Sequence, residues 1–102
     1  MRDEIRRAVV ATAWKKHRGE NPSSLYSYET GRNANMNGGY DYDTKAFYTD
    51  SYHYGTCTNY SVSLTGTSFT GFDYDTGTSF SGCITGNSIQ LYDGGRNFTY
   101  TV

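Results

Sequence analysis

Near the N-terminus, apolar residues recur at the three- and four-residue spacing of an amphipathic helix. Asp3 places a negative charge in the first turn, and Gly19 followed by Pro22 provides a stop signal. The pattern predicts a helix from about residue 3 to His17 and a linker over residues 19–24. Its apolar face consists of Ile5, Ala8, Val9, Thr12 and Ala13, with Val10 and Trp14 at the flank.

After the linker, the apolar spacing changes to the two-residue alternation of β-strands. A first short strand is expected at residues 25–28, whereas residues 31–39 contain too few apolar side chains to form core. We expect one domain over residues 1–102, made of a basic helix (1–18), a linker with a short strand (19–38) and a hairpin-repeat sheet (39–102). The expected strands of that sheet are 39–43, 46–54, 58–64, 67–74, 78–84, 87–93 and 97–102.

The chain repeats itself from residue 40 onward. Residues 64–69 recur as residues 84–89, and an aromatic-Asp pair follows each copy, Phe72-Asp73 and then Tyr92-Asp93. The same pair opens the segment at residue 40. The repeating unit of 20 residues accommodates two strands and two turns, so three imperfect copies predict an antiparallel meander.

In two of these strands the apolar positions change parity. They pass from Phe69 to Phe72 in one strand and from Ile89 to Tyr92 in the other. A two-residue pattern shifts in this way through an irregular residue, so we predict bulges near Gly71 and Leu91. The resulting fold class is α+β, with the N-terminal amphipathic helix packed on a strongly curved antiparallel β-meander. The meander has about six to eight short strands and enough curvature for a half-barrel.

Charge is unevenly distributed along the 102 residues, although the net charge is only −1. The first 18 residues are basic and the remainder is acidic, so we expect the helix to dock on an acidic sheet. The alternative is a free helix that binds nucleic acid or an anionic surface. Its candidate residues are Arg6, Arg7, Lys15, Lys16 and Arg18.

Several classes of protein are disfavoured by the sequence. No stretch approaches the roughly 20 apolar residues of a membrane span, and the N-terminus lacks the pattern of a signal peptide, so we expect a cytoplasmic protein. Cys57 and Cys83 are then expected as free thiols, although their pairing stays open. With His17 and His53 they show no zinc-site spacing, and we expect no metal and no cofactor.

Catalytic constellations are weak. Asp41/Asp43 and Asp73/Asp75 have the roughly 6.6 Å spacing of alternate strand residues, which overlaps the carboxyl separation of inverting glycosidases. Turn formation explains the same residues more simply. His53 has no nucleophile placed beside it by any motif. We therefore assign no catalytic residue and lean away from an enzyme.

Aromatic side chains give the strongest functional indication. The eleven tyrosines exceed what one small core can bury, so some must form a solvent-facing platform. We expect a non-enzymatic module that holds a protein partner on this platform or on a free strand edge, including a second copy of the chain in a homo-oligomer. The alternatives are carbohydrate binding or glycan processing by tyrosine stacking; nucleic acid is disfavoured there by the scarcity of Lys and Arg. The candidate residues are Tyr40, Tyr42, Tyr48, Tyr52 and Tyr54.

The segments Gly71–Gly77, Phe80–Gly82 and Gly86–Asp93 carry a resemblance. They are similar to a family of small uncharacterised bacterial proteins whose second halves repeat hairpin phrases of the kind YDYDTG and GNS-x-x-LYD. The resemblance covers about residues 60–102. It implies a bacterial source and a β-meander, and it transfers no activity and no site residue.

Overall fold

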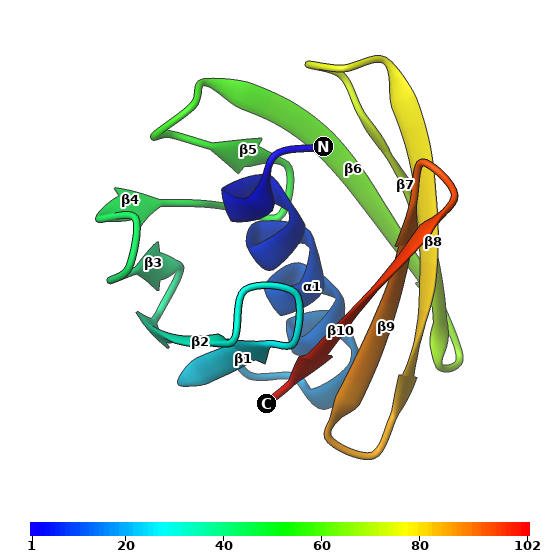
Figure 1. Cartoon of the computed structure of the whole chain (residues 1–102), viewed down its shortest axis with the longest axis horizontal. Coiled ribbons are helices and arrows are strands. Elements are labelled where there is room, and N and C mark those ends of the chain that lie inside the picture. Colours follow the sequence, from blue (N-terminus) through cyan, green and yellow to red (C-terminus); the bar gives the residue numbers. More distant parts are fainter.

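The computed structural model describes all residues, 1–102, as one helix followed by ten strands (Figure 1). The helix α1 covers Asp3–Arg18. The first five strands are short: β1 Ser24–Ser27, β2 Arg32–Asn37, β3 Tyr40–Asp41, β4 Ala46–Phe47 and β5 Tyr52–His53. The last five have six or eight residues each: β6 Thr58–Thr65, β7 Ser68–Asp73, β8 Thr78–Thr85, β9 Ser88–Asp93 and β10 Arg96–Thr101.

All strands are antiparallel and belong to one sheet, in the order β4-β3-β2-β1-β10-β9-β8-β7-β6-β5. The sheet curls until its two end strands meet, because Tyr48 forms a β-bridge with His53 and the Tyr54 N–H donates to the Phe47 carbonyl at 2.9 Å. The result is a nearly closed barrel. The predicted α+β class and meander are confirmed, and the closure goes beyond a half-barrel.

The helix α1 lies inside this barrel (Figure 1). From Ile5 to Trp14 every residue except Arg6 is buried, so the helix is covered on nearly all sides rather than along one apolar stripe. Gly19 ends it in the left-handed conformation, and its N–H donates to the Lys15 carbonyl at 2.7 Å. The predicted docking and C-terminus of the helix are therefore confirmed. The helix lacks the length and apolar character needed to cross a membrane.

The barrel has two ends, which the ion pairs of α1 identify. Arg2 pairs with Asp75 beside the start of the helix, and we call this end the amino-terminal rim. Near the other end of the helix, Lys15 pairs with Asp50 and Arg18 donates to the Gly86 carbonyl; this is the carboxy-terminal rim. The turns of the amino-terminal rim are residues 28–31, 42–45, 54–57, 74–77 and 94–95.

Five structural repeats, rather than three, build the amino-terminal rim. In each repeat the strand before the turn ends with an outward aromatic residue and an inward polar one. In the first four, the inward side chain accepts a hydrogen bond from the turn, as Asp73 does from the Asp75 N–H at 3.0 Å. The inward polar residues of the five repeats are Ser27, Asp41, His53, Asp73 and Asp93, and all are buried. Lys45 and Cys57 adopt the positive φ that Gly77 has in the equivalent turn position.

The predicted bulges are wrong. Strand β7 keeps an unbroken register with β6 and β8 through Gly71, and β9 does so through Leu91. The strands alternate regularly, and only the apolar positions change parity, because the inward residues Asp73 and Asp93 are polar whereas the outward residues Phe72 and Tyr92 are aromatic. A side chain at Gly71 would collide with the Ser61 carbonyl oxygen of β6 and with the Phe80 ring, so this position requires glycine.

Two further strand predictions are corrected. Residues 31–39 form β2 and its turn, because Ala34 and Met36 alternate into the core between polar neighbours. The single strand expected over 46–54 is two short strands, β4 and β5, separated by a connection at residues 48–51.

Candidate functional site

Aromatic pairs decorate the outside of the barrel at the amino-terminal rim. Since one inward polar residue separates two outward aromatics in the first four repeats, the two rings lie on the same face and meet near 5 Å between centroids. Three of the pairs pack edge to face and the fourth is tilted. The pairs are Tyr26 with Tyr28, Tyr40 with Tyr42, Tyr52 with Tyr54, and Phe72 with Tyr74.

Of the five tyrosines predicted as a platform, the structure places four on the outer face of β3, β5 and their turns. Tyr48 instead points into the barrel, where it is buried and donates to the Met36 sulfur at 3.7 Å. Burial, reinforced by the nearby Asp41, raises the pKa of Tyr48 to about 12. The outer position is taken by Phe47, which sequence reasoning missed; its ring lies 4.6 Å from that of Tyr40.

Tyr40, Tyr42, Phe47, Tyr52 and Tyr54 form the aromatic surface. Strand pairing brings them together, because Tyr40 lies opposite Phe47 and the Tyr54 N–H bonds to the Phe47 carbonyl. Phe47 is 60% exposed and borders two shallow grooves of about 500 and 480 Å³. No charged side chain lines either groove. The larger is lined by Gly38, Gly39, Phe47, Tyr48, Thr49 and Tyr54, and the smaller by Asn37, Tyr40, Tyr42 and Phe47.

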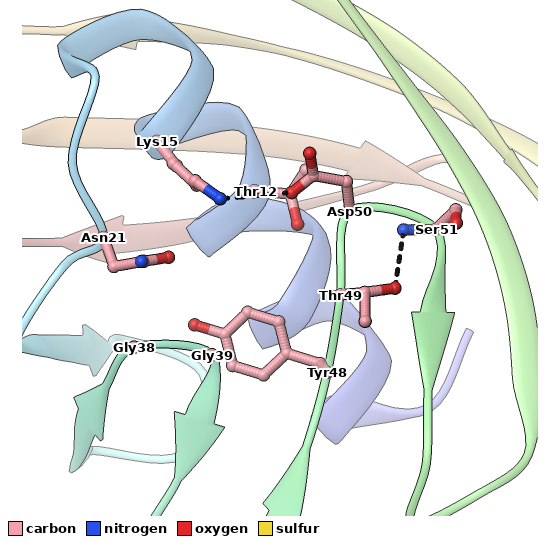
Figure 2. A pocket seen from close by; sticks show the side chains of 9 residues that line it. All are labelled: Thr12, Lys15, Asn21, Gly38, Gly39, Tyr48, Thr49, Asp50 and Ser51. Atoms are coloured by element: carbon pink, nitrogen blue, oxygen red, sulfur yellow. Dashed lines mark hydrogen bonds and ion pairs between the residues drawn. The ribbon is translucent and has the colours of Figure 1, made fainter.

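A separate polar pocket of about 380 Å³ opens at the carboxy-terminal rim (Figure 2). Lys15 reaches across it toward Asp50, with 3.9 Å between Nζ and Oδ1. The buried Thr12 hydroxyl has no hydrogen-bond partner. Its lining residues are Thr12, Lys15, Asn21, Gly38, Gly39, Tyr48, Thr49, Asp50 and Ser51.

The basic residues of the helix do not form one surface. Arg7 is buried and bonds Asp41 at 2.9 Å, and Arg6 stacks 4.0 Å from the Phe98 ring centroid. Burial opposes the charge on Arg7, but the attraction and hydrogen bond of Asp41 together with the attraction of Asp3 and Asp43 outweigh it and raise the pKa of the guanidinium. Lys15, Lys16 and Arg18 lie at the opposite end of the helix, with Arg18 stacked on Trp14.

The carboxylate pairs serve as turn and core elements. Asp41 and Asp73 are buried and accept hydrogen bonds from the N–H groups of Asp43 and Asp75, and the Arg7 guanidinium pairs with both Asp41 and Asp43. The Asp73 side chain caps the turn at residues 74–77, where it accepts from the Asp75 N–H and the Thr76 hydroxyl.

His53 occupies the position of these aspartates in its own repeat. Its Nδ1 accepts from the Thr56 N–H at 3.2 Å, so the proton of the neutral ring is on Nε2. Burial lowers the pKa of His53, and Nε2 has no partner. Cys57 is a free thiol whose sulfur lies 3.8 Å from the Tyr54 carbonyl oxygen, and Cys83 is also free. The arrangement lacks a nucleophile activated by His53.

Comparison of the chain with models of known protein families, with curated proteins and with solved structures found no match.

Proposed function

We propose that this chain is a non-enzymatic binding module that holds a protein partner on its aromatic surface. The observation that supports the proposal most strongly is Phe47, a phenylalanine 60% exposed between two grooves. Its ring has no polar atom to bond water, so exposure costs free energy that a partner would recover.

The composition of the grooves favours a polypeptide with apolar side chains. Neither groove contains a charge, and the tyrosine hydroxyls supply hydrogen bonds around the apolar centre. Aromatic anchors of this kind dominate the free energy of protein interfaces because they bury large areas with few rotatable bonds. Antiparallel pairing of β3, β4 and β5 holds the rings in place before binding.

The nearly closed barrel does not favour association through free strand edges. The end strands β4 and β5 are joined by the Tyr48–His53 bridge and by the Thr49 N–H bond to Tyr52. A second copy of the chain would therefore have to bind through the aromatic surface itself, in a face-to-face dimer. A cytoplasmic location and a bacterial source stay predictions from the sequence; two free cysteines agree with a reducing compartment.

The test compares the wild type with Phe47→Asn and with a matched control, Phe72→Asn, which changes a half-buried ring in another repeat. Peptides from a random phage-displayed library are selected on the wild type after depletion on the Phe47→Asn variant. Analytical ultracentrifugation over a range of concentrations tests self-association in the same three proteins.

We expect either selected peptides rich in apolar anchors, or a dimer, and in both cases binding must be lost in Phe47→Asn and kept in Phe72→Asn. Loss of one buried aromatic anchor corresponds to about 2 kcal/mol or more, a weakening of at least about thirtyfold. The proposal fails if the wild type is monomeric throughout and no selected peptide depends on Phe47.

A further inference from the structure

We propose that the polar pocket at the carboxy-terminal rim binds a sugar ring, either a free monosaccharide or the terminal unit of a glycan. The pocket is distinct from the centre of the aromatic surface, and its volume of about 380 Å³ lies at the small end of the roughly 300–1,000 Å³ typical of small-molecule sites. The inference therefore goes beyond the proposed partner binding and does not depend on it.

The first support is a buried hydroxyl that the protein leaves unpaired. Thr12 is 2% exposed, lines the pocket from the helix, and its Oγ1 has no hydrogen-bond partner. Burial raises the pKa of the Tyr60 phenol, and the nearby Thr12 hydroxyl lowers it in part. Tyr60, however, donates to the Thr49 carbonyl, and no bond of ordinary geometry joins the two hydroxyls. An unpaired buried hydroxyl is costly, and a ligand would remove the cost.

The second support is the mixture of groups around the pocket. Lys15 supplies donors, Asp50 supplies acceptors, and the Asn21 amide, which points toward the same space in Figure 2, supplies both. The ring of Tyr48 forms an apolar wall beside them (Figure 2). Sugar rings match this combination, because each hydroxyl donates and accepts while the ring carbons pack on an aromatic face.

Other small ligands fit less well. Asp50 repels an anion and Lys15 repels a cation, whereas an apolar molecule would cover this ion pair without offering either group a hydrogen bond. The pocket shares its glycine wall with the larger aromatic groove, at Gly38 and Gly39. A Cβ on Gly39 would lie 2.9 Å from the Tyr48 carbonyl oxygen, so only glycine allows the backbone to approach Tyr48 this closely.

The experiment titrates the ¹⁵N-labelled full chain with neutral hexoses, pentoses and N-acetylhexosamines, following amide chemical shifts. A glycan array distinguishes a terminal glycan unit from a free monosaccharide. Thr12→Val removes the hydroxyl and keeps the shape of the side chain, whereas Thr12→Ser keeps the hydroxyl as the matched control. Glycine and inorganic phosphate serve as zwitterionic and anionic probes.

We expect one class of sugar to shift the amides of Gly38, Gly39 and Asp50. Thr12→Val should weaken its binding at least about fivefold and yet raise the melting temperature, because the unpaired hydroxyl is gone. Thr12→Ser and Phe47→Asn should keep the binding. The proposal is overturned if no sugar and no glycan binds, if Thr12→Val binds as the wild type does, or if only glycine or phosphate binds.

Discussion

Replacing Arg7 by Met is the most informative test of the barrel interior. The Arg7 side chain is 5% exposed and contacts three carboxylates: it bonds Asp41 at 2.9 Å, approaches Asp43 at 3.4 Å, and bonds Asp3 one helical turn before it. Methionine keeps much of the length and apolar volume of the side chain. The substitution therefore removes the positive charge and leaves Asp41, 1% exposed, without its ionic partner.

The magnitude follows from the burial of that pair. Removing one member of a buried ion pair costs about 3–5 kcal/mol, because the other charge remains buried and uncompensated. A domain of this size has a total stability of about 5–15 kcal/mol, so the loss is a large fraction of it. At roughly 4 °C or more per kcal/mol, the melting temperature should fall by at least about 12 °C.

Arg32→Met is the matched control, since Arg32 bonds the same Asp43 from outside the barrel while 69% exposed. An exposed pair contributes at most about 1 kcal/mol and is screened by salt. Urea unfolding of both variants, followed by far-ultraviolet circular dichroism at low and high salt, gives the two free energies of unfolding. The reasoning is refuted if Arg7→Met costs no more than Arg32→Met.

Two further predictions concern packing and pH. Gly82→Ala should lower the free energy of unfolding by about 1–3 kcal/mol, because its methyl would overlap the backbone carbonyl oxygen of Gln90 and the Cζ atom of the Phe69 ring. Ser81→Ala, outside the barrel, should change it by less than about 0.5 kcal/mol in the same urea titration. His53→Asn keeps an acceptor for the Thr56 N–H and removes the titratable imidazole. Burial lowers the pKa of His53 in the folded protein from its ordinary 6.5, so below this pH the unfolded chain binds a proton that the folded chain does not. The stability of the wild type must therefore fall as the pH drops through 6.5. Melting temperatures between pH 5 and 8 should show that fall relative to His53→Asn, and parallel curves would contradict it.

The sequence predicted the helix, its end at Gly19 and the meander because these depend on local signals that the structure preserves. It failed at the aromatic-Asp pairs, because the bulges predicted near Gly71 and Leu91 require Phe72 and Tyr92 to face the core, whereas both face outward. Inside this barrel the start of the helix carries Arg6 and Arg7, which interact there with Asp93 and Asp41. Which face of a strand is inside therefore depends on what fills the barrel, and no local pattern contains that information.

The candidate site was predicted in part for the same reason. Four of the five tyrosines lie on the outer face, whereas Tyr48 is inside and Phe47 outside. The alternation over residues 46–48 indicates that these two rings lie on opposite faces but cannot say which is exposed. Ala46, which is buried, and the closing bridge at Tyr48 fix the choice, and that bridge links strands whose contact only the closed barrel reveals. The pocket beneath Lys15 depends on the same closure.

Fluorescence of the single tryptophan tests the enclosure of α1 most directly, and both proposed sites depend on it. Trp14 is 6% exposed inside the barrel. The structure predicts blue-shifted emission that acrylamide quenches poorly, and loss of this protection at the same urea concentration at which the sheet unfolds. Red-shifted, readily quenched emission from the folded protein would show that the helix lies outside the barrel.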